Sequence, residues 1–135
     1  MSAEDATPQL VCHARPDGGP CCENTIVDGR KHGPGRMFYP SGKVYAEETW
    51  VDGELNGLTV TYYETGVKQS ELSYQDGLLH GTVREFYASG ALETEVEYAF
   101  GAKDGREVVY DEEGAIEWEA FYKAGREVKP PPTGT

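Results

Sequence analysis

Glycine recurs along this chain at a fixed interval of 24 residues, and no other feature constrains the fold as strongly. Three columns keep this interval: Gly29, Gly53, Gly77 and Gly101; Gly33, Gly57, Gly81 and Gly105; and Gly42, Gly66, Gly90 and Gly114. A constant period of this size is typical of repeat proteins, in which each unit buries its apolar surface by packing against its neighbours. The sequence therefore predicts a linear array of similar units.

The stretches between the glycines have the pattern of β-strands. In residues 92–98, Leu92, Thr94, Val96 and Tyr98 alternate with glutamates. Alternation with period two indicates a strand with one apolar face, and here the other face is acidic. These stretches are also too short and too rich in Tyr, Val and Thr to favour helices.

The glycines fall where consecutive strands have to reverse direction. Pro40-Ser41-Gly42 and its equivalents link two strands within a unit, and Asp52-Gly53 and its equivalents link one unit to the next. Positive φ or a close backbone approach is expected there, because glycine has no Cβ to clash. The predicted turn glycines are Gly29, Gly33, Gly42, Gly53, Gly57, Gly66, Gly77, Gly81, Gly90, Gly105 and Gly114.

The predicted fold is all-β, with 24-residue β-hairpin units forming one elongated, twisted antiparallel sheet. Extending the columns gives a single repeat domain over residues 10–129, between a flexible tail over 1–9 and a disordered tail over 130–135. The domain has a degenerate leading unit (10–27), regular units (28–51, 52–75, 76–100 and 101–124) and a terminal half-turn (125–129). Consecutive prolines from Pro130 end the pattern, since proline cannot continue a ladder.

Acidic residues outnumber basic ones two to one. Twelve Lys and Arg against 24 Asp and Glu give a net charge of −12. A field of this sign repels nucleic acid phosphates and anionic lipid surfaces, and it attracts basic proteins. We therefore expect a basic protein partner, no nucleic acid and no membrane association. Plain solubility is the alternative explanation of the charge, and the oligomeric state stays open.

Two columns are candidates for partner binding. A glutamate recurs at Glu47, Glu71, Glu95 and Glu119, and a tyrosine recurs at Tyr39, Tyr63 and Tyr87. All members of both columns have odd residue numbers, and residues an even number apart in a strand point to the same face. The pattern therefore predicts a stripe of tyrosine and glutamate on one face. Tyrosine supplies rigid contact area, and glutamate complements the lysines or arginines of a partner. Two other interpretations stay open: the carboxylates hydrogen-bond to turn backbone, and the tyrosines pack within the second face of the sheet.

The chain has no recognisable catalytic constellation. His32 and His80 occupy equivalent turn positions 48 residues apart, where Asn56 and Asp104 stand in the other units, and this is typical of turn residues. No serine or cysteine has a base and an orienting acid at a local spacing. We therefore expect no enzyme activity, no catalytic residue and no cofactor.

Three cysteines, Cys12, Cys21 and Cys22, precede the regular units. Vicinal cysteines close a tetrahedral zinc site poorly and a second Cys-x-x-Cys is missing, so we predict no metal site. An odd count in a small chain favours reduced thiols and a cytoplasmic location, with export open if a signal was removed. The alternative is a disulfide between Cys12 and Cys22, which face each other if Phe38 pairs with Val44 in the equivalent hairpin. A register shift of one residue brings Cys21 there instead.

The second and third regular units carry motifs of a known family. The motifs are Asp52-Gly53-Glu54-Leu55-Asn56-Gly57, Tyr62-Tyr63-Glu64-Thr65-Gly66 and Glu71-Leu72-Ser73-Tyr74. Together they resemble the MORN-variant repeat that typifies the YwqK-type antitoxin (immunity) proteins of bacteria. The resemblance implies an immunity protein that neutralises a toxin, here a basic one, by direct binding through an acidic, aromatic sheet face. A MORN-type scaffold without an inhibitory role is the alternative, because the motif specifies the repeat more closely than the function.

Overall fold

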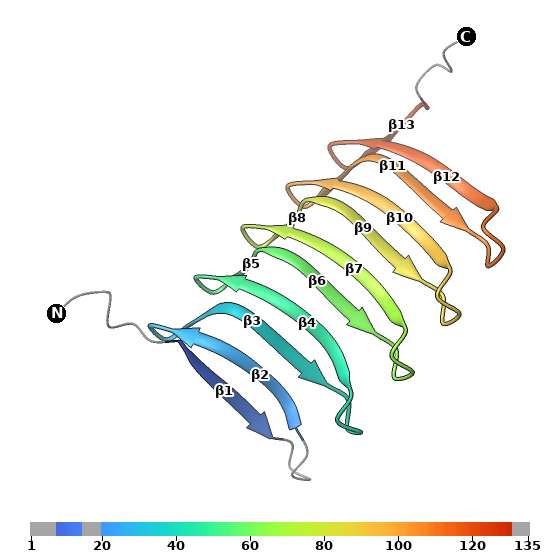
Figure 1. Ribbon diagram of the computed structural model, residues 1–135. Coiled ribbons are helices and arrows are strands. Elements are labelled where there is room, and N and C mark those ends of the chain that lie inside the picture. Colours follow the sequence, from blue (N-terminus) through green and yellow to red (C-terminus); the bar gives the residue numbers. More distant parts are fainter. Residues whose placement is uncertain (1–7, 15–19, 131–135) are drawn as a thin grey trace.

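The computed structural model describes residues 8–14 and 20–130, and in these ranges it is all-β, as predicted. One antiparallel sheet holds the strands in sequence order, with its N-terminal and C-terminal strands at opposite ends (Figure 1). The strands are β1 (Gln9–Ala14), β2 (Pro20–Val27), β3 (Arg30–Phe38), β4 (Val44–Val51), β5 (Glu54–Leu55), β6 (Gly57–Tyr62), β7 (Lys68–Gln75), β8 (Leu78–Leu79), β9 (Gly81–Phe86), β10 (Leu92–Ala99), β11 (Ala102–Tyr110), β12 (Ile116–Lys123) and β13 (Arg126–Val128). The predicted elongated sheet of hairpin units is confirmed.

Each unit ends in a two-residue turn that requires glycine. Val51 pairs with Glu54, so the turn consists of Asp52 and Gly53, with φ of 48° and 85°. Two consecutive positive φ values define a type I′ turn, whose twist matches that of the flanking strands and whose preferred sequences include Asp-Gly. The Gly53 amide donates a 2.8 Å hydrogen bond to the carbonyl oxygen of Lys31, so each turn packs on the preceding one. All the predicted turn glycines have positive φ.

A one-residue bulge follows the other turn of every regular unit. Phe38 pairs with Val44 as expected, but Met37 pairs with Ala46, so Tyr45 has no partner in the ladder. In the other three regular units, the equivalent bulge leaves Gln69, Glu93 and Glu117 without a partner in the ladder. An extra residue in one strand makes odd and even positions exchange faces across the bulge. A period of two therefore cannot be carried from one strand of a hairpin to the next.

The two faces of the sheet carry different side chains. Directly paired residues on neighbouring strands share a face. One row contains Glu47, Val60, Glu71, Arg84 and Glu95, and we call this side the Glu face. The neighbouring row on the opposite face contains Ala46, Thr61, Ser70, Glu85 and Thr94.

The core of the described sheet is thin, because the sheet is a single layer (Figure 1). Its buried apolar side chains are Ala46, Val96, Val108 and Ala120, and Val108 is only 1% exposed. Val108 pairs with Glu95 and Glu119, which places it on the Glu face. The expected division into one apolar and one acidic face is thus incomplete: the valines at 60 and 108 interrupt the acidic row.

The first hairpin pairs in one register from Gln9 to His13 and has a bulge at Cys21, between the pairs His13–Cys22 and Ala14–Pro20. Gln9, placed in the tail by the sequence prediction, opens β1 and pairs with Ile26 of β2. At the other end, β13 pairs with the last residues of β12. The rest of the two predicted tails, apart from Pro8 and Pro130, lies outside the described residues. The described part contains no helix that could cross a membrane.

Candidate functional site

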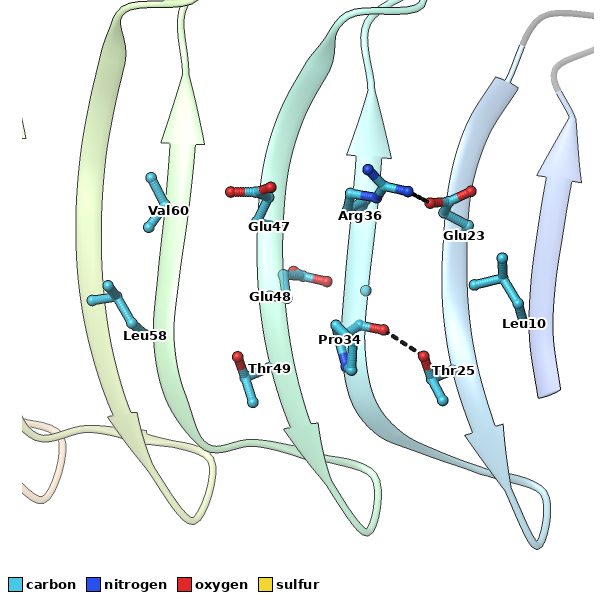
Figure 2. A pocket seen from close by; sticks show the side chains of 11 residues that line it. Leu10, Glu23, Thr25, Pro34, Arg36, Glu47, Glu48, Thr49, Leu58 and Val60 are labelled. Carbon is cyan, nitrogen blue, oxygen red and sulfur yellow. Dashed lines mark hydrogen bonds and ion pairs between the residues drawn. The ribbon is translucent and has the colours of Figure 1, made fainter. Parts of the chain in front are cut away.

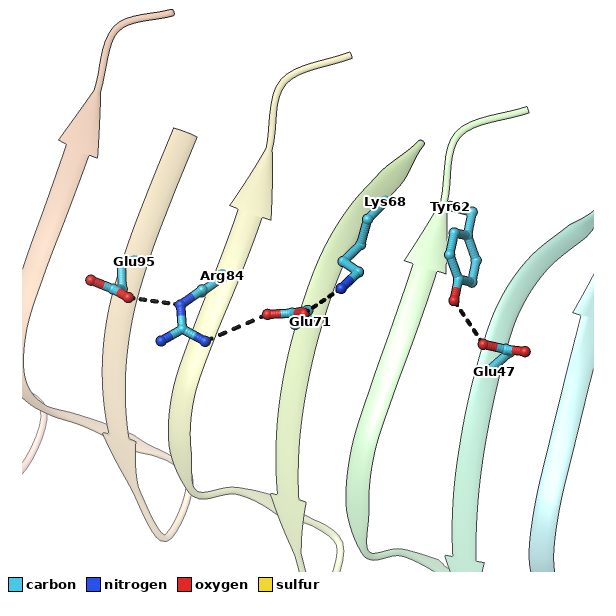
Figure 3. A network of polar contacts seen from close by, with 6 residues as sticks. All are labelled: Glu47, Tyr62, Lys68, Glu71, Arg84 and Glu95. Carbon is cyan, nitrogen blue, oxygen red and sulfur yellow. Dashed lines mark hydrogen bonds and ion pairs between the residues drawn. The ribbon is translucent and has the colours of Figure 1, made fainter. Parts of the chain in front are cut away.

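The glutamate column forms a line of ion pairs across the Glu face (Figure 3). Arg84 of β9 lies between two members of the column, with its Nε 2.7 Å from Glu95 Oε2 and its Nη1 3.5 Å from Glu71 Oε1. Lys68 of β7 adds a second cation, with its Nζ 2.7 Å from Glu71 Oε2. The hydrogen bond from Lys68 is the main cause of the lowered pKa of Glu71, with Arg84 contributing. Glu71 and Glu95 thus bind side-chain cations of their own or a neighbouring strand rather than turn backbone.

Cations also reach the two ends of the row. Arg36 pairs with Glu23, and Arg106 pairs with Glu119. The hydrogen bond to Glu119 raises the pKa of Arg106. Arg84 could be recognised from the sequence as a cation that offsets the acids, but Arg36 and Arg106 were not predicted, although Arg36 and Arg84 stand 48 residues apart in one position of the repeat.

Glu47 is the exception in this column. Within the described residues, no lysine or arginine lies within ion-pair distance of its carboxylate. Its partner is Tyr62, whose hydroxyl donates a 2.7 Å hydrogen bond to Glu47 Oε1 (Figure 3). This hydrogen bond raises the pKa of Tyr62. Arg36 lies opposite Glu47 in the ladder, but its guanidinium pairs with Glu23 instead. On the other side of Glu47, Val60 occupies the position that Arg36 and Arg84 hold in alternate units.

A surface hollow of about 510 Å³ opens beside Glu47 (Figure 2). We call it the Glu47 hollow, and it is lined by Leu10, Glu23, Thr25, Pro34, Gly35, Arg36, Glu47, Glu48, Thr49, Leu58 and Val60. It crosses β1 to β6 on the Glu face, where small side chains leave room between larger apolar ones. Leu10 and Leu58 are 63% and 48% exposed, which is high for large apolar side chains.

The tyrosine column lies on the face opposite the glutamates, so the expected single stripe is wrong. Tyr63 lines a depression together with Thr61, Ser70 and Glu85 of the opposite face. The bulge at Gln69 is the reason, because it separates Tyr63 from Glu71 by one extra residue. Each hydroxyl donates a 2.6 Å hydrogen bond to a carbonyl 23 residues ahead: Tyr39 to Tyr62, Tyr63 to Phe86, and Tyr87 to Tyr110. The column therefore ties each unit to the next.

The acids near these tyrosines have no cation partner. Glu85, Glu93 and Glu117 form no ion pair with the described residues. The pKa of Tyr87 is raised, first by burial and then by the charges of Glu117 and Glu93. These three carboxylates leave negative charge on the opposite face that no cation of the described sheet neutralises, whereas Glu107 on that face pairs with Lys103.

His32 lies within β3 and His80 directly follows β8, so the turn placement that their spacing predicted is wrong for His32, although both side chains contact a turn. The Nδ1 atom of His32 accepts a 3.2 Å hydrogen bond from the amide of Asp52, and that of His80 accepts a 3.1 Å bond from the amide of Phe100. Asp104 accepts from the amide of Ala124 in the same way, at 3.0 Å. This position therefore caps the type I′ turn of the following unit.

The cysteines are placed by the register of the first hairpin. Cys12 pairs with Glu23, and Cys22 pairs with His13, so Cys12 and Cys22 are not directly opposite as supposed. The bulge at Cys21 shifts the pairing by one residue relative to the prediction. Cys12 therefore faces the residue after Cys22, and not Cys22 or Cys21. Cys21 and Cys22 carry free thiols, whereas the side chain of Cys12 lies outside the described residues. In the described part, no three His, Cys, Asp or Glu side chains are placed to hold a metal ion.

Three segments match the family model of the MORN repeat variant, at residues 31–52, 55–76 and 79–99. They run from β3 to β10, and the β11–β12 hairpin continues the same geometry beyond them. A comparison with curated proteins gives no match. Repeats of this kind indicate an interaction module that binds through an extended surface. The chain therefore contains three MORN-variant repeats, at residues 31–52, 55–76 and 79–99.

Proposed function

We propose that this protein is a cytoplasmic immunity, or antitoxin, protein that binds a basic protein toxin and neutralises it by covering its active surface. The proposal needs no catalytic group and no cofactor. An open single-layer sheet offers an extended surface on both faces, which suits the recognition of another protein. The repeats support a binding role, and the resemblance of residues 52–74 to YwqK-type proteins supports the antitoxin role.

One observation carries the proposal: many carboxylates of the sheet have no internal cation. The ion pairs of the described sheet involve Glu23, Glu71, Glu95, Glu107 and Glu119. Outside these pairs stand Glu47 on one face and Glu85, Glu93 and Glu117 on the other. With a net charge of −12, such a surface accelerates the encounter with a positively charged protein.

The test uses the product of the gene beside the one that encodes this chain. That product is expressed alone and together with this protein, and growth is measured. We expect growth arrest from the neighbour alone, recovery on co-expression, and a complex that co-elutes in size-exclusion chromatography and weakens as salt rises. A neighbour that forms a complex without being toxic contradicts the antitoxin role and favours a scaffold. A toxic neighbour that neither binds nor is neutralised contradicts the proposal.

A further inference from the structure

Glu47 is the member of the repeated glutamate column that binds no cation in the described sheet. Arg36 and Arg84 supply cations at one position of the repeat, and Val60 occupies the same position between Glu47 and Glu71. Glu71 is compensated by Lys68 and Arg84, but Glu47 has only the Tyr62 hydroxyl (Figure 3). The Oε2 atom of Glu47 accepts no hydrogen bond from the described residues, so one carboxylate oxygen stays available.

We propose that the Glu47 hollow receives a lysine or arginine side chain of the basic partner, and that this side chain supplies the missing cation. The inference rests on the proposed function for the partner. The charged head binds Glu47 Oε2 while Tyr62 holds Oε1. A carboxylate held by a hydroxyl loses little freedom on binding, which favours affinity.

The walls of the hollow fit the rest of such a side chain. Lysine and arginine carry apolar stems that pack along apolar surface while the charged head reaches a polar partner. Leu10, Pro34, Leu58 and Val60 line the hollow and supply that surface (Figure 2). The volume of about 510 Å³ leaves room for a whole side chain with its stem.

The charges of the hollow select a cation. Arg36 is the basic residue of the lining, and Glu23 already neutralises it. Glu47 therefore leaves the hollow with an excess negative charge, which disfavours a phosphate or carboxylate ligand. A second copy of this chain is also disfavoured as occupant, because each copy carries a charge of −12.

The inference is tested with small probes that need no toxin. Nα-acetyl-arginine methylamide is titrated into the full chain, and its neutral isostere Nα-acetyl-citrulline methylamide serves as the matched probe. We expect the methyl NMR signals of Leu10, Leu58 and Val60 to shift with the arginine probe and not with the citrulline probe. Equal shifts with both probes, or shifts elsewhere only, overturn the inference.

Two protein variants separate the hollow from general charge. Glu47→Gln is expected to weaken binding of the arginine probe by roughly a factor of three to five, as for an exposed ion pair. Glu117→Gln removes the same charge from the opposite face, where no ion pair is lost, and is expected to leave binding unchanged. An equal loss of probe affinity in both variants would mean that the probe responds only to the net charge of the protein, and it would contradict the inference.

Val60→Arg is the sharper variant, because it builds the missing cation into the chain. Its guanidinium would lie between Glu47 and Glu71 as that of Arg84 lies between Glu71 and Glu95, so we expect it to abolish probe binding and to raise the melting temperature. Gln75→Arg, at an exposed position on the same sheet, adds the same charge and is expected to do neither. If a toxin binds wild type and Val60→Arg with equal affinity, the Glu47 hollow is not the binding site, but the proposed antitoxin function is still supported. If the arginine probe binds the hollow but no neighbouring gene product is toxic, the hollow is supported and the proposed antitoxin function is contradicted.

Discussion

The hydroxyl of Tyr63 donates a 2.6 Å hydrogen bond to the carbonyl oxygen of Phe86, one unit further along the chain. The bond joins the end of one hairpin to the next, where the ladder itself is interrupted by turns. Tyrosines at 39 and 87 repeat it. This tie explains why tyrosine rather than phenylalanine follows the aromatic residue at the end of the strand in three units.

Removing this hydroxyl is expected to weaken the sheet without changing its surface shape. Tyr63→Phe should lower the free energy of unfolding by about 1 kcal/mol, the usual net value of a protein hydrogen bond. Tyr45→Phe is the matched control, because the Tyr45 hydroxyl has no hydrogen-bond partner in the described sheet. Urea unfolding followed by circular dichroism measures both, and equal stabilities of the two variants would contradict the role of the tie.

The last type I′ turn offers a stabilising change. Ala124 has φ of 51°, where Asp28, Asp52 and Asp76 stand in other turns. Asparagine tolerates this left-handed region better than alanine. Ala124→Asn is therefore expected to raise the free energy of unfolding by roughly 0.5 kcal/mol. Ala115→Asn, at an exposed position without positive φ, should not raise the free energy of unfolding. An increase of the same size in that variant would contradict this explanation.

The ion pairs of Glu71 predict a pH dependence. Its folded-state pKa is lowered from 4.5, so its contribution is complete above that value and is lost as the pH falls through the folded-state pKa. Glu71→Gln should therefore be less stable than wild type at pH 7, by up to about 1 kcal/mol because its partners are exposed. The difference should narrow near pH 3. Glu93→Gln, which removes the same charge without breaking an ion pair, is the matched control.

The cap supplied by Asp104 can be tested locally. Asp104→Ala removes the acceptor for the Ala124 amide and should cost about 1 kcal/mol, whereas Asp104→Asn keeps an acceptor oxygen and should cost less. Hydrogen exchange of the Ala124 amide provides the measurement. Exchange that is equally slow in wild type and Asp104→Ala would show that the carboxylate does not protect this turn.

The sequence predicted whatever depends on a local signal. Asp52 and Gly53 specify a type I′ turn by themselves, and the 24-residue period carries that turn along the array. The bulge at Tyr45 has no such signal, because Tyr45, Gln69, Glu93 and Glu117 share no property that distinguishes them from neighbouring strand residues. Missing the bulge placed the tyrosines on the wrong face and Cys12 opposite the wrong residue. The alternation of Arg36, Val60, Arg84 and Val108 was visible in the sequence but gained meaning only once these positions were known to adjoin the glutamates.

The tie from each tyrosine to the carbonyl 23 residues ahead has a consequence for how such a protein can vary in size. Every bond of this kind, and every turn cap, joins a unit only to its immediate successor. A duplicated stretch of 24 residues would therefore carry its own donors and meet ready acceptors, and it would lengthen the sheet by two strands, or about 10 Å. The length of the binding surface can therefore change by duplication of whole units, while the existing units keep their sequence and contacts.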